Sequence, residues 1–419
     1  MAIIMLLIAD LQGSFAVNAN DEFAVKILQE AESLTKKLPK ESQGAVLAKI
    51  AAEYQRFGRD ADATTLWVEM EQSVEKSSDR EFCELLLTAM AVQKTRVGEF
   101  ENGKTLLQKI EDAPTRHRAI QQVARELCDQ GKFKEGVEFA ESIPRNSRVL
   151  FDAMEEIGLA AAKGGDTKSA ARASRGMNPG MGGSMARKLR TVSRMCNSYW
   201  KTGNEKSAIP FMGQGKKFSD IIKLDLESTL IIDTTWAALQ ADDFESELKK
   251  LLDVLKKDKS KVDKDEVRLS MASVVLSFDH VDLIKHFRHS NEESSYNALL
   301  DLQVAHHFAN SGKTDPTLKA IEKVKHPILA AECYVKLSRF HLDEKNLEEA
   351  QKHLIAGKPL MREFFKKETQ PDYFWGVFQD YVSACASAKL HRDALALVRQ
   401  LKEPKKVPEL MVQIVISMK

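Results

Sequence analysis

A short turn recurs along this chain at intervals close to the length of one helical hairpin. In each copy a glycine is followed five positions later by a small residue, either glycine or alanine. The clear copies are separated by 40, 33, 34 and 38 residues and begin at Gly58, Gly98, Gly131, Gly165 and Gly203. Because glycine readily adopts the left-handed backbone that ends a helix, each copy predicts a turn between two antiparallel helices.

Weaker copies of the turn continue at a similar spacing through the rest of the chain. We place them, 39, 36, 34, 33 and 44 residues apart, at Asp242, Phe278, Gly312, Lys345 and Lys389. Small residues such as Ala51, Ala91 and Ala124 predominate seven positions before each turn, where they would let the two helices of a hairpin approach closely. The sequence therefore predicts an all-α solenoid of about ten antiparallel helix-turn-helix repeats.

The charge balance argues against a nucleic-acid binder, and the cysteine pattern argues against a metal or redox role. With 62 basic and 61 acidic residues the net charge is +1, which argues against a globally basic nucleic-acid binder. The cysteines are odd in number, lie far apart and form no CxxC pair: Cys83, Cys128, Cys196, Cys333 and Cys385. Each falls in a segment that we expect to form the first helix of a hairpin. We therefore interpret them as small apolar packing residues.

The turn belongs to a fuller pattern that resembles a known repeat family. A small residue lies seven positions before the glycine, an aromatic residue two positions after it at Phe100 and Phe133, and a small residue five positions after it. This pattern resembles the tetratricopeptide repeat, whose unit is about 34 residues long. The resemblance covers roughly residues 40–400, although the family's tryptophan near the start of the first helix is absent. It implies a right-handed superhelix whose concave groove, lined by first helices, binds proteins.

The resemblance also implies which residues would face a ligand. In that family these positions lie 13, 10, 6 and 3 residues before the turn glycine. In the third and fifth units they include Arg118, Gln121, Arg125, Arg190, Ser193, Asn197 and Trp200. Guanidinium and amide groups suit the carboxylates and backbone of a peptide. The leading hypothesis is therefore a non-enzymatic scaffold that binds a protein or peptide partner and needs no cofactor.

A local basic region supports an alternative hypothesis. No acidic residue lies between Asp166 and Glu205, and Arg187, Arg190 and Arg194 share one helical face in that interval. The region 168–201 could bind nucleic acid or another polyanion. Alternatively, its charges are neutralised by acidic residues elsewhere in the solenoid, such as Glu135, Glu138 and Glu141. We favour neutralisation.

One segment matches a nucleotide-binding motif by letter. Residues 98–105 fit the phosphate-binding pattern GxxxxGK[ST], which requires a preceding buried strand. The preceding residues 85–97 have helical spacing instead, and Glu99 and Glu101 would repel phosphates. The segment also aligns with the turn at 131–136. We therefore predict a repeat turn there and no nucleotide site.

The histidines concentrate in the second half of the chain. His286 and His289 are three residues apart and could offer two metal ligands from one helical face. No acidic residue or cysteine lies at a spacing that would complete this set, and the adjacent His306 and His307 should point in different directions. We interpret the histidines as structural and expect no metal site. A metal-dependent enzyme is the least favoured alternative.

The N-terminus combines two opposing signals. The apolar run 2–9 and the small residues Val17 and Ala19 fit a signal peptide ending at Ala19, which would export the protein to the periplasm or the exterior. However, no basic residue precedes the run and Asp10 interrupts it, so a cytoplasmic protein with an apolar N-terminal segment is the alternative. No stretch approaches the roughly 20 apolar residues of a membrane span.

Repeat quality suggests a division of the remaining chain. The turn pattern weakens near the lysine-rich stretch 249–268, which we interpret as a solvated helix followed by a connector. We expect N-terminal repeats over 20–260 and degenerate C-terminal repeats over 261–419. The glycine-rich segment 176–184 is expected to form a loop and is the other candidate boundary.

Overall fold

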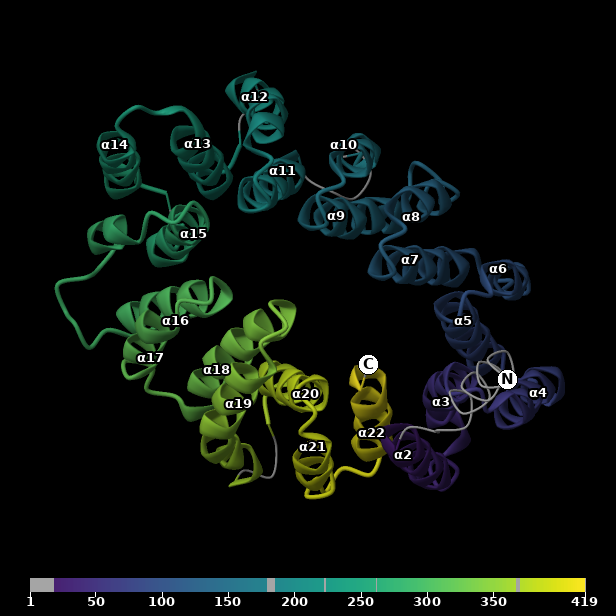
Figure 1. The fold of residues 1–419 in the computed structure, drawn as a ribbon. Coiled ribbons are helices and arrows are strands. Elements are labelled where there is room, and N and C mark those ends of the chain that lie inside the picture. Colours follow the sequence, from purple (N-terminus) through teal and green to yellow (C-terminus); the bar gives the residue numbers. More distant parts are fainter. Residues whose placement is uncertain (1–18, 179–184, 222–223, 261, 367–369, 419) are drawn as a thin grey trace, which may run out of the picture.

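The chain forms a solenoid of helical hairpins whose two ends meet (Figure 1). The computed structural model describes residues 19–178, 185–221, 224–260, 262–366 and 370–418. Within these ranges the regular elements are helices, and no strand is present. The predicted all-α solenoid is therefore confirmed. The proposed cleavage site lies at the start of the first described helix, while residues 1–18 and most of the expected loop at 176–184 fall outside the described residues.

Each hairpin places one helix on the inner side of the ring and one on the outer side (Figure 1). The inner helices are α3 (Gly44–Arg56), α5 (Arg80–Arg96), α7 (Ala113–Asp129), α9 (Arg148–Lys163), α11 (Met185–Lys201), α13 (Leu226–Gln240), α15 (Lys264–Ser277), α16 (Ser295–Asn310), α18 (Pro327–Asp343) and α20 (Asp372–Ser387). Their outer partners are α4 (Asp60–Lys76), α6 (Phe100–Gln108), α8 (Phe133–Ala140), α10 (Thr167–Gly176), α12 (Glu205–Ile221), α14 (Phe244–Lys257), the 3-10 helix η3 (Val281–His286), α17 (Thr314–Ile321), α19 (Leu347–Met361) and α21 (His391–Val398).

The predicted turns lie where the inner helices end. A positive φ occurs at all five clear turn glycines, and also at Gly312, Lys345 and Lys389. The same capping bond recurs: the amide of Lys132, just after Gly131, donates to the carbonyl of Leu127 at 2.9 Å. Two predicted positions were wrong. The positive φ near residue 278 belongs to Asp279, and at Asp242 the chain leaves α13 through an extended Ala241 instead.

Small residues five positions after the turn allow close packing within a hairpin. A Cβ placed at Gly136 would lie 2.9 Å from the carbonyl oxygen of Ala124, and one at Gly103 would lie 2.8 Å from that of Ala91. Both partners are the small residues predicted seven positions before the turn, and both are fully buried. The two positions therefore set the distance between the helices, as the sequence pattern indicated.

Replacing glycine with alanine should have opposite effects on stability at two exposed positions, one in a turn and one inside a helix. Gly131→Ala should destabilise the protein by about 1 kcal/mol, because φ is +74° there and a Cβ strains a left-handed residue. Gly376→Ala should stabilise it by about 0.5–1 kcal/mol, because Gly376 lies within α20 and a Cβ meets nothing within 4 Å. Chemical denaturation of both variants checks this; effects of equal sign would contradict the assignment of strain to the turn.

The ring is closed by two helices from opposite ends of the chain. α2 (Ala19–Thr35) takes the outer place and α22 (Lys406–Ser417) the inner place of an eleventh hairpin (Figure 1). The largest hydrophobic cluster includes Ala24 of α2 and Val412 of α22, so one core joins both ends. Across this seam Arg399 pairs with Glu30 at 2.5 Å. The terminal helices therefore complete each other.

The remaining elements are the lysine-rich stretch and two short 3-10 helices. The lysine-rich stretch contains the end of α14 and the start of α15, with non-helical residues described at 258–260 and 262–263 between them. This agrees with the expected helix and connector, except that the helix begins earlier, at Phe244. Short 3-10 helices η1 (Lys40–Ser42) and η4 (Arg362–Lys366) complete the described elements.

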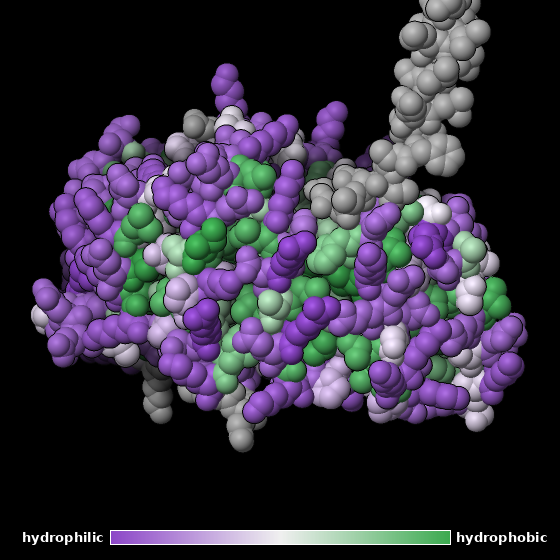
Figure 2. Space-filling view, turned by 60° about the horizontal axis from the view of Figure 1, so that its bottom comes forward, coloured by the Kyte–Doolittle hydropathy of each residue, from purple (hydrophilic) through white to green (hydrophobic). Residues whose placement is uncertain are grey.

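Figure 2 shows one face of the molecule, on which hydrophobic residues form a broken band among hydrophilic ones. Among the described helices, none is both long and apolar enough to cross a membrane.

Candidate functional site

Two adjoining cavities lie on the inner face where the ring closes. The larger, about 1010 Å³, is lined by α3, α5, α7 and α22, and the smaller, about 540 Å³, by α3, α18, α20 and α22. They share Lys49 and Gln413. We call the pair the closure groove. Its polar and charged lining includes Lys49, Glu53, Gln55, Arg56, Gln93, Arg96, Gln122, Arg125, Glu126, Asp129, Gln130, Arg339, Asp380, Glu409 and Gln413.

A buried carboxylate organises the larger cavity. The side chain of Glu53 is 2% exposed and pairs with Arg56 Nε at 2.7 Å and Arg96 Nη2 at 3.0 Å. Arg56 also donates from Nη2 to the carbonyl of Val415 in α22 at 2.9 Å. Because a buried charge is costly without partners, this network fixes the relative positions of α3, α5 and α22. The groove wall and the ring seam therefore depend on the same residues.

Some other polar groups in the groove already have an ion-pair or hydrogen-bond partner within the protein, and others do not. Lys49 pairs with Glu409 at 3.4 Å, and Arg339 with Asp380 at 2.7 Å. In contrast, Arg125 is exposed and forms no ion pair within the described part of the chain. Gln93 Oε1 is buried and has no hydrogen-bond partner there. The larger cavity is therefore lined by an exposed guanidinium on α7 and by a residue of α5 whose buried amide oxygen is unsatisfied.

The structure places the predicted third-unit residues on α7 in different surroundings. Arg125 lines the closure groove, whereas Arg118 is exposed nearer the N-terminus of α7 and lies outside both cavities. Gln121 donates to Glu156 at 3.3 Å. Residues 9, 6, 5, 2 and 1 positions before the turn glycine line the larger cavity in this unit. Of the family's ligand-facing positions in this unit, position 6 therefore lies in the groove, and positions 13, 10 and 3 do not.

The predicted fifth-unit residues on α11 serve mainly packing between units. Ser193 is buried against Thr235, and Trp200 packs edge-on against Phe278 with ring centroids 5.4 Å apart. Arg190 pairs with Glu227 at 3.1 Å. Asn197 is half-buried, and its Oδ1 has no hydrogen-bond partner among the described residues. The structure thus brings none of them to the closure groove.

The basic region is largely neutralised within the solenoid. Arg187 pairs with Asp152 at 2.7 Å and with Glu155. Arg172 pairs with Glu138 at 3.0 Å and Glu141 at 2.6 Å, two of the acids that the sequence suggested. Arg194 is exposed, and no ion pair forms at it in the described ranges. Of the three arginines on the predicted anion-binding face, two are therefore engaged by carboxylates, so the hypothesis of a basic face is not favoured.

The apparent nucleotide motif is an ordinary repeat turn. Gly98 ends the α5 hairpin turn with φ +88°, and the segment before it is helical. Lys104 pairs with Glu101 at 3.0 Å, and Glu99 pairs with Lys94 at 3.0 Å. The lysine that would hold a phosphate therefore lies beside a carboxylate on α6.

The cysteines and most histidines have structural surroundings. Each cysteine lies on an inner helix, and all five are free thiols. Burial raises the pKa of Cys128 to about 12. The expected shared helical face of His286 and His289 was wrong, since η3 ends at His286. These two histidines contact different acids, Glu245 at 2.8 Å and Asp265 at 3.1 Å respectively.

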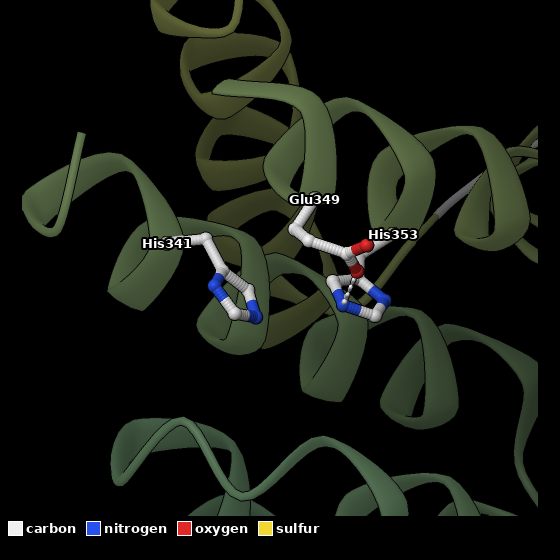
Figure 3. A group of neighbouring side chains, drawn as sticks. All are labelled: His341, Glu349 and His353. Atoms are coloured by element: carbon white, nitrogen blue, oxygen red, sulfur yellow. Dashed lines mark ion pairs between the residues drawn. The ribbon is translucent and has the colours of Figure 1, made fainter. Parts of the chain in front are cut away.

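One cluster of metal-ligating side chains was missed by the sequence analysis. His341 of α18 and Glu349 and His353 of α19 each offer a ligand atom, and these atoms lie within 4.8 Å of one another (Figure 3). The missed signal is the four-residue spacing of Glu349 and His353, which places both on one helical face. The hairpin turn at Lys345 then brings His341 beside them.

Comparisons with known proteins give no family. No family model matches the chain, and no curated protein matches it. Among solved structures, Ton1535 from Thermococcus onnurineus NA1 is 13% identical with a TM-score of 0.23, covering 78% of this chain and 96% of that one. A circular tandem repeat protein with novel repeat topology and enhanced subunit contact surfaces is 13% identical with a TM-score of 0.18, covering 95% and 96%. Both scores are too low to bear on function.

Proposed function

We propose that this protein is a non-enzymatic scaffold that binds an extended segment of a protein partner in the closure groove. The observation that carries the proposal is that Arg125, whose guanidinium forms no ion pair among the described residues, and Gln93, whose buried amide oxygen has no partner there, line one cavity of about 1010 Å³. An extended peptide offers both complements, because its backbone N–H groups donate and its carboxylates accept. The resemblance to tetratricopeptide repeats, which bind proteins along their first helices, supports the same function.

The groove chemistry narrows the kind of segment expected. Arg56 and Arg96 are held by Glu53, so Arg125 is the groove arginine that can bind an acidic side chain without breaking an existing pair. Amide side chains such as Gln122 and Gln413 offer both donors and acceptors nearby. We therefore propose a partner segment with one acidic side chain that contacts Arg125 and a backbone N–H that contacts Gln93.

The proposal is tested by site-specific cross-linking followed by affinity measurement. A photoreactive residue at Gln122, in the groove, should capture a partner that the same residue at Glu71, exposed on α4, does not capture. For a peptide from that partner, Arg125→Ala should weaken binding about tenfold or more, as for a central interface arginine.

Arg148→Ala is the matched control, because Arg148 is 72% exposed at the start of α9 and lies outside the groove. It should leave the affinity within about twofold, as expected for a residue outside an interface. Equal effects of the two substitutions, or the absence of a partner specific to Gln122, would overturn the proposal.

A further inference from the structure

The cluster of His341, Glu349 and His353 lies within a single hairpin. Its members come from the end of α18 and the beginning of α19, close to the turn at Lys345 (Figure 3). The two imidazole rings are nearly parallel, with centroids 5.3 Å apart and an interplanar angle of 19°. A carboxylate oxygen of Glu349 lies 3.5 Å from His353 Nε2. Three donor groups therefore face a common point from two packed helices.

His353 is the residue whose surroundings call for a ligand. It is 2% exposed, and its Nε2 has no hydrogen-bond partner among the described residues. A buried polar atom without a partner is uncommon in folded proteins and requires an explanation. An ion bound at this nitrogen would supply that explanation.

The three groups match the preferences of a transition-metal ion. Two imidazole nitrogens and one carboxylate form a ligand set used for Zn²⁺, with a further position left for water. Ca²⁺ and Mg²⁺ prefer sets made of oxygen atoms. Ligand atoms around a tetrahedral Zn²⁺ lie about 3.3 Å apart, given metal–ligand distances of about 2.0 Å. The atoms here lie within 4.8 Å of one another, so side-chain rotation, chiefly of half-buried Glu349, would bring them together.

From this arrangement we propose that His341, Glu349 and His353 form a binding site for a divalent transition-metal ion such as Zn²⁺. The ion would join the last turn of α18 to the first turns of α19. It would also give His353 Nε2 a direct bond, where the protein supplies only the 3.5 Å contact with Glu349. The proposal is independent of partner binding in the closure groove, whose smaller cavity is lined by other residues of α18.

Two neighbouring side chains contact the proposed ligands and would affect the binding of an ion. Thr314 Oγ1 lies 3.4 Å from His341 Nε2 and restricts the orientation of that ring. Lys352 Nζ lies 3.2 Å from both carboxylate oxygens of Glu349 and would have to release at least one of them. The lysine side chain is 66% exposed, so it can move into solvent. Lys352 therefore competes with the ion for Glu349.

The test measures Zn²⁺ binding to the full chain, prepared without a polyhistidine tag. Isothermal titration with Zn²⁺ alone should show one ion per chain at a site that raises the melting temperature. His341→Ala and Glu349→Gln should each weaken this binding at least about tenfold, the loss expected when one ligand of three is removed. Lys352→Ala should bind as tightly as the parent chain or more tightly.

Controls separate this site from weak binding at other histidines and from unfolding. His117→Ala removes a half-buried histidine of α7 and should leave the titration unchanged. Circular dichroism of each variant before titration checks that it is folded; His353→Gln gives a third ligand variant, and visible absorption of bound Co²⁺ reports the ligand geometry. Absence of Zn²⁺ binding to the parent chain, or unchanged binding in folded His341→Ala and Glu349→Gln, would overturn the proposal.

Discussion

Replacing Ile414 with alanine should lower the free energy of unfolding by about 2–5 kcal/mol, the range found when a large apolar side chain is removed from a core. Ile414 is fully buried in α22, whose inner place in the ring is supported by α2, α3, α20 and α21. The substitution leaves a cavity where the two ends of the chain meet. It should therefore weaken closure as well as stability, and the radius of gyration in solution should rise at a lower denaturant concentration than in the parent chain.

Ile355→Ala is the matched control for this prediction, because it makes the same chemical change on the surface. Ile355 lies on α19 and is 57% exposed. Its replacement should change stability by no more than about 0.5 kcal/mol. Urea denaturation followed by circular dichroism, together with small-angle scattering, measures both effects. Equal stability of the two variants would show that α22 does not pack at the seam as described.

Replacing Glu53 with alanine should destabilise the protein by about 3 kcal/mol, because breaking a buried ion pair leaves its partners uncompensated. Arg56 and Arg96 would then face each other with side chains only 30% and 19% exposed. Repulsion between them should also strain the bond from Arg56 to the carbonyl of Val415. We therefore expect the loss to be larger at low salt, where repulsion between partly exposed charges is screened less.

Glu101→Ala provides the comparison at an exposed ion pair. Glu101 pairs with Lys104 at 3.0 Å, but its side chain is 79% exposed. The expected change is within about 1 kcal/mol, as for most surface pairs. Denaturation of both variants at low and high salt measures the difference. If Glu53→Ala were as mild as Glu101→Ala, the network of Glu53 would not hold the groove wall.

The hairpins could be predicted from the sequence because their signals are local. A positive φ favours glycine, and close helix packing favours small residues, so each turn carries its own pattern. Lys345 and Lys389 were placed correctly without glycine because each keeps an alanine five residues later. At Asp242 the local pattern had disappeared, and there the prediction failed.

Ring closure could not be predicted in the same way. It depends on the small rotation between successive hairpins, summed over the whole array, and no single repeat encodes that sum. The residues of α2 and α22 are amphipathic like those of any other hairpin, so nothing local shows that they pair with each other. The ion pair between Arg399 and Glu30 joins residues that are 369 positions apart in the sequence.

The candidate site was predicted in part for a similar reason. Arg125, six positions before the turn glycine, lines the groove as the family register suggests. A residue near the middle of the inner face stays on that face even if the assumed helix rotation is slightly wrong. Positions 10 and 3 lie near the edge of that face, where an error of one residue moves a side chain into the contact between units, as with Ser193 and Trp200. The cluster around His353 required the hairpin geometry as well as the spacing.

The split eleventh hairpin restricts how this protein can change in length. An open solenoid can gain or lose a repeat at either end, since each repeat contacts only its neighbours. Here an inserted or deleted hairpin would shift the two terminal helices out of position and expose the apolar faces that they now cover. Variation by repeat duplication is therefore disfavoured. A circular permutation that joins the described ends through a linker and opens the chain at another turn should instead preserve the fold.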